Sequence, residues 1–293
     1  MPIETVAIMA PGDMGHAVGR VLAAGGLRVI TCLAGRSART RTLAESAGVE
    51  DVGDDRTLVG EADMLLSILV PARAQDLAAR LAPALQAAAK GLLYVDCNAI
   101  APQRARRIGE VVGAAGGRFV DAGIIGPPPR RGAAATRFYA SGAAAGDFAA
   151  LGAFGLDVRI VGERPGDASA LKMCYAAFTK GTTAIMTELL VAAERLGVGE
   201  PLRAELEQSQ AAMLERMGKS VPAMVPKAHR WVGEMAEIAR TFEDVGLTPL
   251  TFEGAAALYA FVAGTAPGRT SPEDWRAADR PLDQVIAGLA AED

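Results

Sequence analysis

Two patterns of apolar and polar residues alternate along the first half of the chain. Short apolar runs are typical of buried strands, and the stretches between them carry apolar residues at the three- and four-residue spacing of helices. Helical stretches 74–89 and 102–114, for example, separate apolar runs, which lie at residues 6–9, 28–33, 64–70, 91–97, 118–122, 136–141 and 158–161. Strands that alternate with helices predict an α/β fold with a doubly wound, mostly parallel sheet.

Beyond about residue 162 the strand pattern stops. The rest of the chain is rich in alanine and leucine at helical spacing, and glycine and proline divide it into segments 167–196, 201–217, 224–245, 249–263 and 271–290. We therefore predict two domains, an α/β domain over residues 1–163 and an all-helical domain over residues 164–293.

The first predicted strand runs directly into a glycine-containing turn and a helix. Such a turn holds the pyrophosphate of a dinucleotide, because its glycines let the backbone approach the phosphates and the helix start supplies unpaired N–H groups. Ala10 replaces the first glycine of the usual G-x-G-x-x-G pattern, and Asp13 is placed to cap the helix. An ordinary strand-to-helix turn is the alternative. We expect a Rossmann-type cofactor site at Ala10, Pro11, Gly12, Asp13, Met14 and Gly15.

The end of the second predicted strand indicates which dinucleotide fits. Enzymes that bind NAD place an acidic residue there, against the ribose 2′-hydroxyl. This chain has Arg36 and Ser37 instead, with no carboxylate before Glu45. A guanidinium grips phosphate through two parallel hydrogen bonds and a serine hydroxyl adds another, so we predict NADP(H) as the cofactor. Arg39 and Arg41 are equally well explained as solvated residues of a helix start.

Composition narrows the class of partners. The chain is 51% hydrophobic with a formal net charge of −4, and it lacks the clustered basic residues of nucleic-acid-binding proteins. We find neither an unbroken run of about 18 apolar residues nor a basic targeting segment, so we expect a cytoplasmic protein that binds no nucleic acid and no membrane. Cys32, Cys97 and Cys174 match no metal-site spacing, and we expect them to be reduced and buried, with no metal bound.

Four further segments follow in order along the chain, at residues 69–71, 96–102, 121–126 and 166–175. Together with the glycine turn and the Arg36–Ser37 pair, they resemble the β-hydroxyacid dehydrogenase family. This 6-phosphogluconate dehydrogenase-like group includes 3-hydroxyisobutyrate dehydrogenases and imine reductases. The resemblance covers nearly the whole chain and is greatest for a poorly characterised bacterial branch with a distinctive helical C-terminal domain.

The resemblance implies that Leu69, Val70 and Pro71 cover the nicotinamide side of the cofactor. Asn98 ends a predicted strand at the edge where α/β proteins bind ligands, so we assign it to both the cofactor and the substrate. A plain loop cap is the alternative for this asparagine.

The resemblance also gives Lys172 the central chemical role. In the family, a lysine at this position exchanges a proton with the substrate oxygen while hydride moves to or from the nicotinamide. A buried amine can lose its proton at accessible pH, whereas a guanidinium cannot. Tyr175 and Thr179 follow Lys172 at i+3 and i+7 on the same predicted helix face. We therefore assign Tyr175 to the catalytic site. The alternative is that Tyr175 is an aromatic residue of the core. Lys180 is expected to be solvated.

Two departures from the family pattern bear on the substrate. Ile125 stands where family dehydrogenases carry a serine that holds a carboxylate, and Tyr175 and Ala176 stand where they carry an asparagine. Gly126 is expected to offer a backbone N–H, and the segment that begins at His229 is expected to reach the cleft, although a single histidine is often a cap. The predicted substrate-binding residues are Asn98, Ile125, Gly126, Lys172, Tyr175, His229, Arg230 and Glu234.

These inferences favour an NADP(H)-dependent oxidoreductase that acts on a small polar substrate of the β-hydroxy acid or keto acid type. An imine reductase is one alternative, although such members usually replace the lysine with Asp or Tyr. A non-catalytic NADP(H)-binding sensor or scaffold is the other. Segment 167–196 is apolar on more than one face, so we also expect a homodimer through the helical domain, unless the first domain covers that face.

Overall fold

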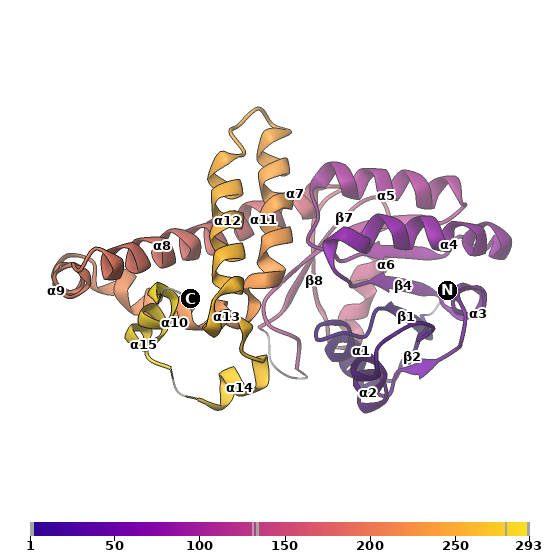
Figure 1. Cartoon of the computed structure of the whole chain (residues 1–293). Helices are drawn as coiled ribbons and strands as arrows, with labels where there is room; N and C mark the ends of the chain where they lie inside the picture. The colour runs from indigo at the N-terminus through magenta and orange to yellow at the C-terminus, as the bar shows by residue number, and fades with distance from the viewer. Residues whose placement is uncertain (1–2, 131, 133–134, 279, 292–293) are drawn as a thin grey trace. The chain divides into compact units, whose positions relative to one another are not determined.

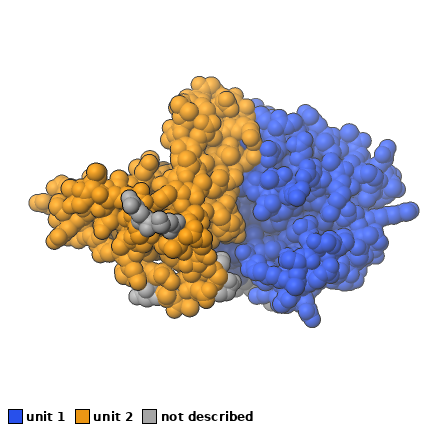
Figure 2. Space-filling view, in the orientation of Figure 1, with its two compact units in different colours: residues 1–173 blue, residues 174–293 orange. Residues whose placement is uncertain are grey.

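The computed structural model describes residues 3–130, 132, 135–278 and 280–291. It divides into two compact units, Met1–Met173 and Cys174–Asp293, which Figure 2 distinguishes by colour. The first unit contains an α/β sheet and the second is helical (Figure 1). The predicted fold class is therefore confirmed. Among the described residues, no helix has the length and apolar character needed to cross a bilayer.

An eight-stranded sheet forms the centre of the first unit, in the order β3-β2-β1-β4-β5-β6-β7-β8. Neighbouring strands are parallel, except that β6 and β7 are antiparallel. The chain proceeds to one side of β1 and then returns to the other, so the carboxyl ends of β1 and β4 flank the position where doubly wound sheets bind ligands. The strands are Thr5–Met9 (β1), Arg28–Thr31 (β2), Glu50–Asp51 (β3), Met64–Ser67 (β4), Leu93–Asp96 (β5), Arg118–Ile125 (β6), Arg137–Ser141 (β7) and Asp157–Gly162 (β8).

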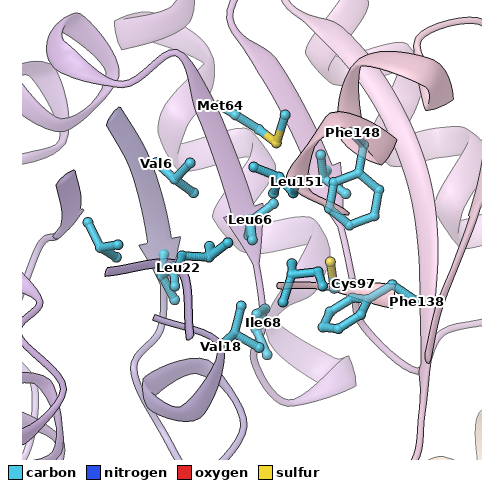
Figure 3. Packing of buried hydrophobic residues seen from close by; sticks show 14 of the residues in the cluster. Val6, Val18, Leu22, Met64, Leu66, Ile68, Cys97, Phe138, Phe148 and Leu151 are labelled. Carbon is cyan, nitrogen blue, oxygen red and sulfur yellow. The ribbon is translucent and has the colours of Figure 1, made fainter. Parts of the chain in front are cut away.

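Helices cover both faces of the sheet, and each face has its own core. On the face seen in Figure 3, Val6 of β1 belongs to the same cluster as Leu22 of α1 and Phe148 of α6. On the opposite face, Met9 clusters with Leu81 of α4. Burial on both faces explains why the parallel strands read as continuous apolar runs. The helices are Gly15–Ala24 (α1), Ala38–Ser46 (α2), Asp55–Glu61 (α3), Ala74–Ala88 (α4), Pro102–Ala114 (α5), Ala145–Ala149 (α6) and Asp167–Ala176 (α7).

The second unit contains more helices than its alanine-rich pattern predicts. Segment 167–196 is interrupted by a π-helical turn at Ala177–Gly181, and segments 201–217 and 271–290 are each divided between two helices. In Figure 1 α11 and α12 lie side by side. The ring centroids of Trp231 on α11 and Tyr259 on α12 are 5.2 Å apart. The helices are Thr182–Arg195 (α8), Gly199–Ser209 (α9), Ala211–Met224 (α10), Ala228–Glu243 (α11), Leu250–Gly264 (α12), Ala266–Arg269 (α13), Pro272–Ala277 (α14) and Leu282–Ala290 (α15).

Candidate active site

The glycine turn lies between β1 and α1, at the carboxyl edge of the sheet. The Ala10 N–H donates to the Ile68 carbonyl at 3.0 Å, which ties the turn to the end of β4. A Cβ on Gly15 would collide with the Ala10 carbonyl, so close packing requires that glycine. A Cβ on Gly12, in contrast, would meet no atom within 4 Å. The described residues leave the space over Gly12 open, and this open backbone fits the approach of a pyrophosphate.

The start of α1 is also available to a ligand. Met14 is the N-cap residue, and its side chain makes no capping hydrogen bond to this helix. The Asp13 carboxylate accepts a hydrogen bond from Arg39 Nη2 at 2.6 Å, and a cap from Asp13 to α1 stays a prediction. The first N–H groups of a helix need acceptors, and a phosphate supplies them. The described residues include no group of three or more His, Cys, Asp or Glu that could hold a metal ion.

The segment after β2 contains the residues predicted to choose between NADP and NAD. Arg36 is half-buried there, and Ser37 Oγ accepts the Thr40 N–H at 3.3 Å as the N-cap of α2. A carboxylate does reach the end of β2, because Asp51 of β3 accepts the Leu33 N–H at 3.0 Å. Since Asp51 comes from the neighbouring strand, the search for an acidic residue along β2 did not find it.

The loop predicted to cover the nicotinamide is held by Asn98. The Leu69 N–H donates to Asn98 Oδ1 at 2.6 Å, and Asn98 Nδ2 donates to Ser67 Oγ at 2.8 Å and to Asp96 Oδ2 at 3.0 Å. Both amide hydrogens of this buried side chain are therefore used within the chain, where they join β4 to β5. Val70 is 56% exposed in the same loop. A direct contact from Asn98 to cofactor or substrate stays a prediction.

Two buried aspartates stand opposite each other where β5 and β6 pair. Asp96 and Asp121 are register partners, and neither is exposed. Burial raises the pKa of Asp96 to about 7, although hydrogen bonds from Asn98 act in the opposite direction. Burial also raises the pKa of Asp121. Sequence reasoning missed both residues as parts of the site, and a lone aspartate at the end or middle of an apolar run was the only signal for them.

Lys172 lies on α7, which packs closely on β6. A Cβ on Gly123 would be 2.8 Å from Lys172 Cβ and 3.2 Å from the Ala168 carbonyl oxygen, so only glycine allows this approach. Lys172 is half-buried. The structure therefore places the predicted general acid/base against the sheet, in the unit that also contains the glycine turn.

Ile125 ends β6, and Gly126 follows it. The Ile125 side chain is 3% exposed and belongs to the core. Gly126 has φ of 126°, and a Cβ there would collide with the Ala135 carbonyl, so the fold itself requires glycine. A contact from either residue to the substrate stays a prediction.

The helix that carries Lys172 changes its pitch soon afterwards. Because α7 ends at Ala176, the α-helical spacing expected between Lys172 and Thr179 is not kept, and Thr179 Oγ1 donates to the Tyr175 carbonyl at 3.1 Å. Tyr175 is 45% exposed. Cys174 is also exposed, contrary to expectation, whereas the other cysteines, Cys32 and Cys97, are buried as expected.

In the second unit, the expectation of a solvated Lys180 is wrong. Its side chain is only 12% exposed, pairs with Glu234 of α11, and places Nζ 4.9 Å from the centre of the Trp231 ring. Burial lowers the pKa of Lys180, and the Glu234 carboxylate acts in the opposite direction. His229 and Arg230 are exposed in the first turn of the same helix. The structure thus joins Glu234 to Lys180, while contacts of this segment with substrate stay predictions.

Comparison with known proteins identifies the family. Residues 5–152 match the NAD binding domain of 6-phosphogluconate dehydrogenase. The chain belongs to the 6-phosphogluconate dehydrogenase-like family of β-hydroxyacid dehydrogenases. The matched domain indicates a nicotinamide cofactor. Residues 193–262 match a domain of unknown function, DUF1932.

Two similar proteins match more of the chain than this domain does. An uncharacterised 28.5 kDa protein of Methanothermus fervidus is 30% identical over 219 residues, which are 75% of this chain and 79% of that protein. The conserved protein MTH1747, described as structurally similar to 3-hydroxyacid dehydrogenases, is 29% identical with a TM-score of 0.68. The match covers 88% of this chain and 96% of that protein.

Two solved enzymes share the fold at lower identity. Mycobacterium tuberculosis 3-hydroxyisobutyrate dehydrogenase with L-serine is 20% identical, with a TM-score of 0.72. The match covers 99% of this chain and 100% of that enzyme. An imine reductase variant of Myxococcus stipitatus in complex with NAD+ is 19% identical, with a TM-score of 0.59. The match covers 94% of this chain and 99% of that enzyme.

Proposed function

We propose that the protein is an NADP(H)-dependent oxidoreductase that transfers hydride between the nicotinamide and a small polar β-hydroxy acid or its keto acid, with Lys172 as general acid/base. The observation that carries the proposal is the packing of Lys172 over Gly123 in the unit that also holds the open glycine turn. The nicotinamide-binding domain and the likeness to a protein described as similar to 3-hydroxyacid dehydrogenases support it.

The bound nicotinamide supplies a hydride donor or acceptor. During oxidation, the neutral amine of Lys172 takes the proton of the substrate hydroxyl as the carbon-bound hydrogen leaves as hydride. During reduction, its ammonium returns a proton to the carbonyl oxygen. Gly126 supplies a backbone N–H for a substrate carboxylate, and Tyr175, on the same helix as Lys172, supplies a hydroxyl.

Arg36 supports NADP(H) over NAD(H). It follows the end of β2, where a guanidinium suits the 2′-phosphate of the adenosine ribose. Arg39 Nη2 donates to Asp13 and Arg41 Nη2 to the Leu33 carbonyl, at 2.6 and 2.7 Å, and we assign the phosphate contact to Arg36.

A second candidate function is reduction of a C=N bond in the same site. The exposed Tyr175 favours it, because its hydroxyl is available as a proton donor at 45% exposure. The fold shared with imine reductases agrees with this alternative. A non-catalytic NADP(H)-binding role, suggested by Ile125 in place of serine, is excluded by turnover of any substrate.

Oxidation of NADPH against a panel of β-keto acids, aldehyde acids and cyclic imines tests the proposal. We expect Lys172→Ala and Lys172→Arg to lose turnover by about 10²–10⁴-fold, the usual effect of removing an acid/base, while NADPH affinity stays near normal. Lys219→Ala is the matched control, because Lys219 is an exposed residue of α10 paired with Glu215. Either Lys172 variant with wild-type turnover would overturn the mechanism, and preference for cyclic imines would select the second candidate.

A further inference from the structure

The carboxylate of Asp121 receives four hydrogen bonds in the interior of the first unit. Asp121 Oδ1 accepts from Ser169 Oγ at 2.6 Å, and Oδ2 accepts from the N–H groups of Gly166 and Ser169, both at 2.9 Å, and from Ser141 Oγ at 3.1 Å. All four donors are neutral groups. Burial of a carboxylate costs free energy of folding unless hydrogen bonds compensate for the lost water. The four donors around Asp121 therefore indicate that its carboxylate has a structural or functional role at this position.

This carboxylate lies at the start of α7, where the residue before the helix, Gly166, has no side chain that could act as a cap. Gly166 precedes the helix with φ of 103°, and a Cβ there would be 2.7 Å from Arg106 Nη1 and 3.2 Å from the Pro102 carbonyl oxygen. A serine or aspartate cap therefore does not fit. The sheet supplies the missing acceptors instead: Asp121 takes the N–H groups of Gly166 and Ser169, and Ser141 Oγ takes that of Ala168 at 3.0 Å.

A second contact between β6 and α7 lies one step further along both elements. Gly123 is two residues after Asp121 and on the same face of β6, and Lys172 is three residues after Ser169 on α7. Two strand residues span about 6.6 Å and three helical residues rise about 4.5 Å, so the second contact follows the first in the same direction along both elements. The bond from Asp121 to Ser169 sets the rotation and axial position of α7, and Gly123 leaves room for the stem of Lys172.

We propose that Asp121 is a positioning residue for Lys172: by capping α7 from within the sheet, its carboxylate fixes the place from which the lysine reaches the substrate. This inference rests on the proposed function for its catalytic consequence. Displacement of an acid/base by about 1 Å lowers the rate by up to about 100-fold, so a loose cap is costly even in a folded protein.

Substitution at Asp121 and at its closest donor tests the inference. Asp121→Asn places an amide NH2 among donors, and we expect kcat to fall about 10- to 100-fold with the Michaelis constant for NADPH within about twofold. Ser169→Ala removes the 2.6 Å bond and should have a smaller effect in the same direction, whereas Ser169→Thr retains the hydroxyl and should restore kcat. If Asp121→Asn does not fold, the Ser169 pair decides: equal kcat in Ser169→Ala and wild type overturns the inference.

The small number of lysines provides a readout that needs no substrate. The chain has five lysines, at 90, 172, 180, 219 and 227. Reductive methylation with 13C-formaldehyde gives each a methyl resonance, and the loss of one signal in Lys172→Arg assigns that of Lys172. We expect this signal to shift in Asp121→Asn and Ser169→Ala but not in Ser169→Thr, while the Lys219 signal stays in place. An unmoved Lys172 signal in the folded Asp121→Asn protein overturns the inference.

A double mutant separates this inference from the proposed function. If Asp121 acts through Lys172, adding Asp121→Asn to Lys172→Ala lowers turnover by less than about twofold, because the two effects are not additive. A further 10-fold loss in the double mutant contradicts the inference and leaves the role of Lys172 intact. Wild-type turnover in Lys172→Ala contradicts the proposed function, and the methyl resonances still report whether Asp121 positions the lysine.

Discussion

Among single residues, Arg36 is the one that we propose selects NADP(H) over NAD(H). Arg39 and Arg41 are held by Asp13 and by the Leu33 carbonyl, and Arg36 lies half-buried beside them. A charge-assisted hydrogen bond is worth about 1.5–3 kcal/mol, so we expect Arg36→Ala to weaken NADPH binding about tenfold to a hundredfold and to leave NADH binding unchanged.

Fluorescence titration with both cofactors measures this preference. Arg107→Ala is a suitable control, because Arg107 is an exposed residue of α5. Equal dissociation constants for NADPH and NADH in the wild-type protein would contradict the assignment. That result would instead favour a contact between the ribose hydroxyls of the cofactor and Asp51, the carboxylate at the end of β3 that accepts the Leu33 N–H.

Asp96 gives a prediction about pH. Burial raises its pKa from 3.8 to about 7, so the folded protein retains a proton that the unfolded chain releases. Stability from this group is fully present below about pH 4 and is lost as the pH rises through about 7. We expect the melting temperature of the wild-type protein, relative to Asp96→Asn, to fall between pH 5 and pH 8. A constant difference between the two melting curves over this range would show that Asp96 does not titrate there.

Residues in local motifs could be selected from the sequence as candidates, whereas residues defined by distant contacts could not. Gly12 and Lys172 stand in motifs whose spacing is visible along the chain. The partners of Asp121, in contrast, are Ser141 and Ser169, which lie 20 and 48 positions away. Only the pairing of β6 with β7 and the packing of α7 bring these side chains together, and no short spacing encodes those contacts.

At the scale of elements, the turn between β1 and α1 contains two glycines with different functions. A Cβ on Gly15 collides with the Ala10 carbonyl, so we expect Gly15→Ala to lower the free energy of unfolding by about 1–3 kcal/mol or more. Gly12 has free space in the chain itself, so Gly12→Ala should retain the wild-type melting temperature and lose NADPH affinity. Thermal melts and cofactor titration of the two variants check this, and unchanged NADPH binding in Gly12→Ala would place the pyrophosphate elsewhere.

The π-helical turn at Ala177–Gly181 shows why element boundaries in the second unit were harder to predict. Hydroxyl side chains of Thr182, Thr183 and Tyr259 donate to the carbonyls of Phe178, Thr179 and Lys180 in turn. An alanine-rich segment has a weak hydrophobic period, so one extra residue in the helix leaves no mark in the pattern. Lys180 lies within this turn, and its pair with Glu234 comes from α11, a contact that no short spacing along the chain indicates.

At the scale of the whole molecule, the second unit exposes large apolar side chains along one continuous stretch of helix. Phe178, Ile185 and Leu196 are 60%, 59% and 75% exposed. Arg216 lies over the Phe178 ring at 4.9 Å, which covers only part of that side chain. Apolar surface of this kind is usually buried against another chain, and a second copy related by twofold symmetry is the commonest cover.

We therefore expect a homodimer through the second unit, with a mass in solution of twice 30.2 kDa. Ile185→Glu puts a charge into the proposed interface and should shift the protein toward the monomer, because a buried unpaired charge opposes association. Ile160→Glu is the matched control, since Ile160 is 55% exposed on β8 of the first unit. Light scattering at micromolar concentration measures both variants. A wild-type protein that scatters as a single 30.2 kDa species with full activity would show that no second copy is needed.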